Sequence, residues 1–65
     1  MIIEELIRTL RQRRNEARTP IIELVHNLEQ YSLGTEVEIV GDMDKVLLGK
    51  YKSAKLDGEV LVIKT

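Results

Sequence analysis

Hydrophobic residues recur at spacings of three and four through the first half of the chain. This period places them on one face of an α-helix. The pattern predicts two amphipathic helices, over residues 2–17 and 20–32. Their apolar faces comprise Ile3, Leu6, Ile7, Leu10, Ile21, Leu24, Val25, Leu28 and Tyr31.

Pro20 bears on whether this half forms two helices or one. A heptad-like seam runs unbroken through both segments, at Ile3, Ile7, Leu10, Arg14, Ala17, Ile21, Leu24, Leu28 and Tyr31. A proline inside a continuous helix removes a hydrogen bond and clashes with the preceding turn, at a cost of about 3 kcal/mol. We therefore expect two helices with a break at Arg18-Thr19, where Thr19 is the N-cap and Pro20 the first helical residue. A single kinked helix is the alternative.

The second half of the chain has the pattern of β-strands. The segment TEVEIV, residues 35–40, alternates acidic and hydrophobic side chains, which is typical of a half-buried strand. Two further strands are predicted over residues 45–53 and 59–64, with Gly49 as a bulge in the first of them. Asp57-Gly58 is a hairpin-turn signal between these strands.

Together these patterns predict an α+β fold in a single domain, residues 1–65. Two N-terminal helices, or one kinked helix, within residues 1–33 pack on a three-stranded antiparallel β-meander within residues 35–65. The expected core comprises Ile3, Leu6, Ile7, Leu10, Ile21, Leu24, Val25, Leu28, Val37, Ile39, Leu48, Leu61 and Ile63.

The last predicted strand is apolar on both faces, at Val60, Leu61, Val62 and Ile63. In a simple meander it is an edge strand, and an apolar edge invites pairing with another chain. We therefore expect these four residues to form an oligomer interface, most simply in a homodimer. The alternative is that Val60 and Val62 are β-formers on a partly exposed face.

Composition disfavours several kinds of chemistry. The chain of 65 residues has no cysteine and one histidine, His26, so thiolate and multi-histidine metal sites are excluded. The acids Asp42, Asp44, Asp57 and Glu59 are expected to be turn and surface residues. We expect no enzyme activity, metal or cofactor. No hydrophobic run has the length of a membrane span, so we expect a cytoplasmic protein with no membrane contact.

All five arginines lie in the first third of the chain, at Arg8, Arg11, Arg13, Arg14 and Arg18. The favoured interpretation is a solvated helix end whose guanidinium groups offset the helix dipole and pair with nearby acids. In the alternative interpretation they contact nucleic-acid phosphates or an acidic protein.

These observations favour a small non-enzymatic interaction or regulatory module. It is expected to act by self-association and protein–protein binding. The alternative is a nucleic-acid-binding protein that uses the arginine-rich segment 8–18.

Overall fold

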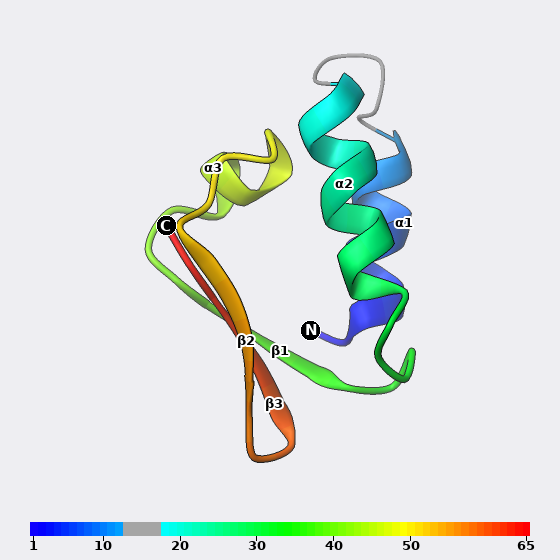
Figure 1. The fold of residues 1–65 in the computed structure, drawn as a ribbon, viewed down its shortest axis with the longest axis vertical. Helices are drawn as coiled ribbons and strands as arrows, with labels where there is room; N and C mark the ends of the chain where they lie inside the picture. The colour runs from blue at the N-terminus through cyan, green and yellow to red at the C-terminus, as the bar shows by residue number, and fades with distance from the viewer. Residues whose placement is uncertain (13–17) are drawn as a thin grey trace.

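The computed structural model describes residues 1–12 and 18–65, and it has the α+β class that the sequence predicts (Figure 1). The described elements, in chain order, are α1 (Ile3–Gln12), α2 (Arg18–Leu28), β1 (Glu36–Val40), α3 (Met43–Leu47), β2 (Ser53–Asp57) and β3 (Val60–Lys64).

The N-terminal half forms two helices that lie side by side and run in opposite directions (Figure 1). The alternative of one kinked helix is therefore wrong. α2 begins at Arg18, so Thr19 lies inside the helix and is not its N-cap. Pro20 falls in the first turn, where a missing N–H costs no intrahelical hydrogen bond. α2 ends at Leu28, four residues before the predicted boundary.

The predicted strand over residues 45–53 is wrong, because its first part belongs to the short helix α3. The Asp42 side chain caps this helix by accepting a hydrogen bond of 2.9 Å from the Asp44 amide. Val46 and Leu47 then turn into the core. Five residues are too few for a helical period to be recognised. The run of valine and leucine at residues 46–48 was therefore interpreted as part of a strand.

Gly49 ends α3 and is not a strand bulge. Its φ is +75°, and its amide donates to the Val46 carbonyl at 2.9 Å, while the Lys50 amide donates to the Lys45 carbonyl at 2.8 Å. This pair of hydrogen bonds is the Schellman arrangement that terminates helices at a left-handed glycine. β2 consequently begins only at Ser53.

The sheet is mixed, with strand order β1-β3-β2, so the antiparallel meander is also wrong. β1 pairs with β3 in parallel, and β2 pairs with β3 antiparallel. The hairpin predicted at Asp57-Gly58 does join β2 to β3, and Gly58 has the positive φ, +65°, that such tight turns require. β3 is therefore the central strand and not an edge.

The core lies between the helices and one face of the sheet, here called the inner face (Figure 1). Most of the predicted core residues are buried there, with Val46 and Leu47 in place of Leu48, which is only partly buried. Ile39 is partly buried and packs against this cluster. The central position of β3 explains why its Leu61 and Ile63 are completely enclosed.

Candidate functional site

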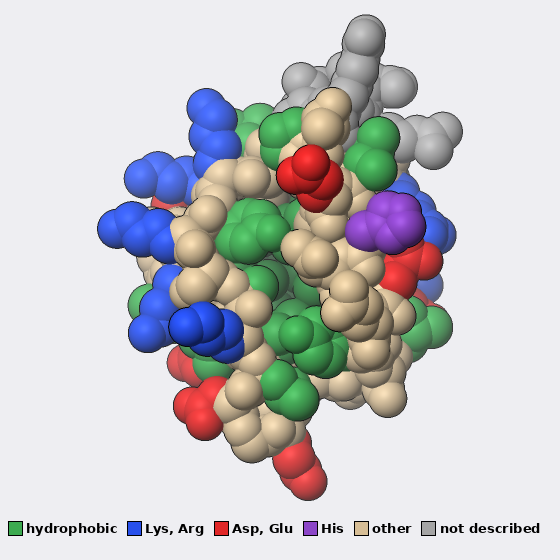
Figure 2. All heavy atoms as spheres, in the orientation of Figure 1, with side chains coloured by type: hydrophobic (Ala, Val, Ile, Leu, Met, Phe, Trp, Pro, Cys, Tyr) green, Lys and Arg blue, Asp and Glu red, His purple; other side chains and the backbone are tan. Residues whose placement is uncertain are grey.

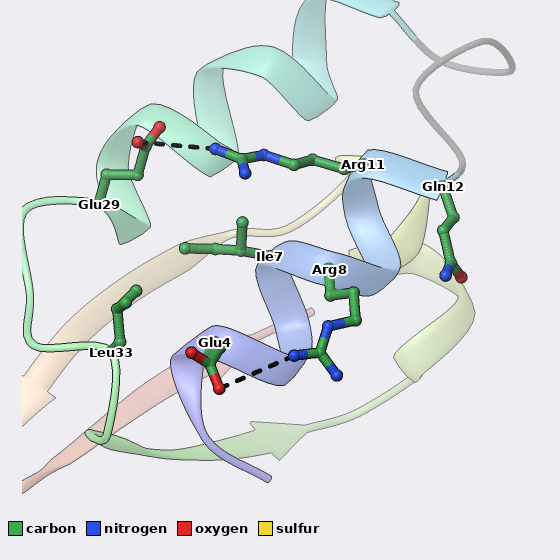
Figure 3. Close-up of a pocket in the computed structure, with 7 residues that line it drawn as sticks. All are labelled: Glu4, Ile7, Arg8, Arg11, Gln12, Glu29 and Leu33. Carbon is green, nitrogen blue, oxygen red and sulfur yellow. Dashed lines mark ion pairs between the residues drawn. The ribbon is translucent and has the colours of Figure 1, made fainter.

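The arginines that the structure describes in full lie beside acids. A groove of about 650 Å³ is lined by residues of α1 and by Glu29 and Leu33 of the segment after α2. Figure 3 shows these side chains. Arg8 pairs with Glu4 on the next turn of α1, and Arg11 reaches across to Glu29, with nitrogen–oxygen distances of 3.8 Å in both pairs. Exposed pairs of this kind contribute little to stability, but they place a carboxylate beside each of the two guanidinium groups.

The structure does not describe the side chains of the other three arginines. Arg13 and Arg14 lie outside the described residues, and Arg18 is the first residue of α2. For Arg8 and Arg11 the geometry supports the favoured sequence interpretation, in which helix arginines pair with nearby acids.

The four residues predicted as an oligomer interface divide between two faces of β3. Leu61 and Ile63 have no exposed area and belong to the core. Val60 and Val62 lie on the opposite, outer face and are partly buried. There, Val62 stands between Glu38 of β1 and Lys55 of β2. The argument that this strand is an open edge is wrong, because it has a neighbour on each side.

The open edge of the sheet belongs instead to β2. The two-residue turn places Asp57 opposite Val60, and this closing pair is hydrogen-bonded in such a hairpin. Because backbone groups alternate along an antiparallel strand, the N–H and C=O groups of Ala54 and Leu56 point away from β3. Among the described residues, no loop, turn or side-chain hydrogen bond reaches these groups.

The same edge carries exposed apolar surface. One row across the inner face runs from Val37 through Leu61 to Leu56. The first two side chains are 6% and 0% exposed, whereas Leu56 is 50% exposed. The helices therefore cover the inner face over β1 and β3 and leave its β2 margin open.

A cleft of about 330 Å³ adjoins this margin. Asn27, Gln30 and Tyr31 line one side, from the end of α2 and the turn that follows it, and Tyr51 and Ala54 line the other. The Asn27 side-chain amide donates to the Tyr51 hydroxyl across the cleft at 3.4 Å. The chain has no phenylalanine or tryptophan, and its two tyrosines, Tyr31 and Tyr51, both line this cleft.

Two lysines, Lys50 and Lys52, flank Tyr51 in the sequence, whereas Lys55 and Lys64 belong to the outer face of the sheet. All five lysines are exposed and come from α3, the loop after it, and strands β2 and β3: Lys45, Lys50, Lys52, Lys55 and Lys64. In the view of Figure 2, basic side chains lie along one side of the molecule and hydrophobic side chains lie in its middle. No lysine forms an ion pair with another of the described residues.

The described part of the chain contains no cluster of potential metal ligands. No group of three or more potential ligands comes together there, and no polar or charged side chain is buried there. Asp42 caps α3, Asp57 ends β2, and His26 is exposed on α2. Their positions are those of structural and surface residues.

Sequence reasoning missed both the β2 edge and the tyrosine cleft. The edge depends on strand order, which no local pattern reports. The cleft had one visible signal, the segment Lys50-Tyr51-Lys52, in which an aromatic residue stands between two cations.

Comparison with known proteins adds no family assignment. No family model, curated protein or solved structure matches this chain. None of the helices in the described ranges is long and apolar enough to span a membrane.

Proposed function

We propose that the protein is a non-enzymatic interaction module that self-associates through the free edge of β2. The observation that carries this proposal is the pair of outward-facing backbone sites at Ala54 and Leu56, beside a half-exposed leucine. An edge with unpaired backbone groups is a ready template for another strand. Strand addition of this kind binds through main-chain hydrogen bonds, with side chains setting specificity.

A second copy of the chain fits this edge in one particular register. Two β2 strands related by a twofold axis at Leu56 run antiparallel, and each Leu56 faces its counterpart. Each Lys55 then lies opposite Asp57 of the second copy, and opposite charges in such cross-strand positions are stabilising. In the neighbouring register, centred on Lys55, two like charges face each other, which is destabilising.

The resulting dimer has a continuous six-stranded sheet of order β1-β3-β2-β2-β3-β1. It removes the two Leu56 side chains from water at the twofold axis and satisfies the edge groups at the same time. Oligomerisation is also a common source of stability in chains of this size, because their single core contributes only about 3–5 kcal/mol.

Nucleic-acid binding through the arginine segment 8–18 is the less favoured proposal. A phosphate that contacts Arg8 or Arg11 has to compete with the carboxylates of Glu4 and Glu29, which pair with these arginines. Charge removal at Arg8 and Arg11 tests this proposal directly, since binding through this segment has to weaken when both cations are lost.

Sedimentation equilibrium over a range of protein concentrations tests the self-association. We expect a dimer that dissociates on dilution. Leu56→Pro should be monomeric throughout, because proline lacks the outward-facing N–H but is tolerated on a free edge. Leu56→Thr is the matched control: it keeps the N–H and should still dimerise, more weakly.

Two results contradict the proposal. One is a wild-type chain that stays monomeric at every concentration. The other is a Leu56→Pro variant that dimerises as tightly as the wild type, since its contact then lies elsewhere. Circular dichroism of each variant confirms that the monomer is folded.

A further inference from the structure

We propose that the cleft between Tyr31 and Tyr51 binds single-stranded nucleic acid. This site is separate from the arginine segment and is complete within one chain. It uses the space above the inner face, whereas strand pairing uses groups in the plane of the sheet, so it does not rest on the proposed self-association.

Stacking surface is the first requirement of such a site, and the cleft provides it. Both aromatic side chains of the protein line it, one from each wall. Every base has a flat π face, so stacking on aromatic side chains binds single strands with little sequence preference. Its volume of about 330 Å³ limits it to one or two bases at a time.

Polar groups for the base edges are the second requirement. Asn27 and Gln30 line the cleft, and each side-chain amide offers both a donor and an acceptor. The hydrogen bond from Asn27 to the Tyr51 hydroxyl is long, 3.4 Å, so a base can replace it with little loss.

Positive charge along the backbone path is the third requirement. Lys50 and Lys52 flank Tyr51 in the sequence, and both are exposed while Tyr51 is half-buried. Two exposed cations thus lie one residue from the Tyr51 ring in the sequence, and their long side chains are available to phosphates on either side of a stacked base. The net charge of −1 conceals this arrangement, because the acids of the hairpin and the start of β1 lie at the other end of the sheet.

An acidic peptide is the competing occupant of a lysine-flanked cleft. Charge alone does not distinguish the two, since lysine attracts both carboxylates and phosphates. The pairing of two tyrosines with two amides favours bases, because a peptide of acidic residues has no flat surface to stack between them.

Fluorescence anisotropy with a short labelled oligouridylate tests the proposal at low salt. We expect binding that weakens with added salt. Tyr51→Leu should weaken it about tenfold by removing a stacking surface, while Tyr51→Phe should leave it nearly unchanged. Lys50→Gln with Lys52→Gln should reduce the slope of log affinity against log salt by about 1.4, as expected for two lost phosphate contacts with a single strand.

The matched control removes two cations elsewhere. Arg8→Gln with Arg11→Gln makes the same change in charge and should leave binding almost intact. If it abolishes binding instead, the arginine segment is the site and the cleft proposal is overturned. The same follows if the chain does not bind at low salt, if Tyr51→Leu binds like the wild type, or if a glutamate peptide binds and the oligouridylate does not.

Proton NMR of the wild-type chain provides a readout that needs no variant. The chain has no phenylalanine or tryptophan, so its aromatic signals come only from the two tyrosines and His26. Stacking predicts upfield shifts of both tyrosine rings as oligouridylate is added. Unshifted tyrosine signals at saturation contradict the proposal even if a cleft variant fails to fold.

Discussion

The two edges of the sheet differ in how the chain covers them. At β1, the N-terminal segment lies along the edge that points away from β3. The Val37 amide donates to the Met1 carbonyl at 2.8 Å, and the Ile3 amide donates to the Thr35 carbonyl at 2.9 Å. At β2, nothing in the described part of the chain takes the corresponding position. The chain therefore covers the first part of the β1 edge with its own backbone, whereas the described residues leave the β2 edge without such cover.

The charge on the two edges differs as well. β1 carries Glu36 and Glu38 on its outer face, so two copies of it repel each other. β2 carries Lys55 and Asp57, which complement each other when the strand pairs antiparallel with its own copy. Both comparisons support the proposal that two copies pair through β2.

The largest expected effect concerns β3, the strand that holds both edges together. Leu61→Ala should lower the free energy of unfolding by about 2–5 kcal/mol, because it opens a cavity in a fully enclosed core. Val62→Ala, on the outer face of the same strand, should cost less than about 1 kcal/mol. Urea denaturation measures both, and equal losses would contradict the assignment of faces.

The next largest effect tests the contact between Gly49, which ends α3, and Pro20 of α2. A Cβ atom added at Gly49 lies 2.5 Å from the Cβ of Pro20, and the left-handed φ is unfavourable for alanine. We expect Gly49→Ala to lower stability by about 3 kcal/mol. Gly58→Ala is the control, since its φ is also positive but no atom lies within 4 Å, so it should cost only about 1–2 kcal/mol. Thermal denaturation that ranks the two variants in the opposite order would contradict this contact.

Charge reversal tests the register of the paired β2 edges. Lys55→Asp places carboxylates opposite each other twice in the dimer, and it should raise the dimer dissociation constant about tenfold, or about 1.4 kcal/mol. Adding Asp57→Lys to it should restore the wild-type value, because the opposite charges are exchanged. Sedimentation equilibrium shows whether the double variant recovers; no recovery would mean that the strands pair in another register or not at all.

The smallest effect concerns the helix arginines. Arg11→Gln should lower stability by less than about 1 kcal/mol, because its partner Glu29 is also exposed to solvent. Adding salt should shrink the difference from wild type further, since exposed charges are screened. Urea denaturation at two salt concentrations measures it, and a large loss that persists at high salt would indicate a structural role for Arg11.

The helical periodicity of the chain was informative because it depends only on local sequence. Spacings of three and four located both helices and nearly all of their buried residues, including Ile3, Leu6, Leu24 and Leu28. The Asp57-Gly58 turn was equally local and correct. These features depend only on residues that are close in the sequence.

Strand order was not predictable in the same way. The apolar run in β3 correctly indicated a strand with hydrophobic residues on both faces, but a strand at the centre and one at an edge have the same pattern. The strand order depends on α3, which lies between β1 and β2 in the chain. It carries the chain away from β1, so that β3 pairs between the other two strands. Its signals, Asp42 and Gly49, are residues that caps share with turns and bulges.

The candidate site followed from topology and could not be read from a motif. Leu56 is one of several leucines in the sequence, and only strand order makes it an exposed edge residue. Tyr31 and Tyr51 are far apart in the chain and meet because α2 lies over the inner face of the sheet.

Residue-resolved amide hydrogen exchange, measured by NMR at low and high protein concentration, tests the contrast between the two edges most directly. The amide of Val37 is already bonded to Met1 within one chain, so its exchange rate should not depend on concentration. The amide of Leu56 should exchange quickly in dilute protein and slow markedly as the dimer forms. A Leu56 amide that exchanges at the same rate at every concentration would contradict self-association through β2.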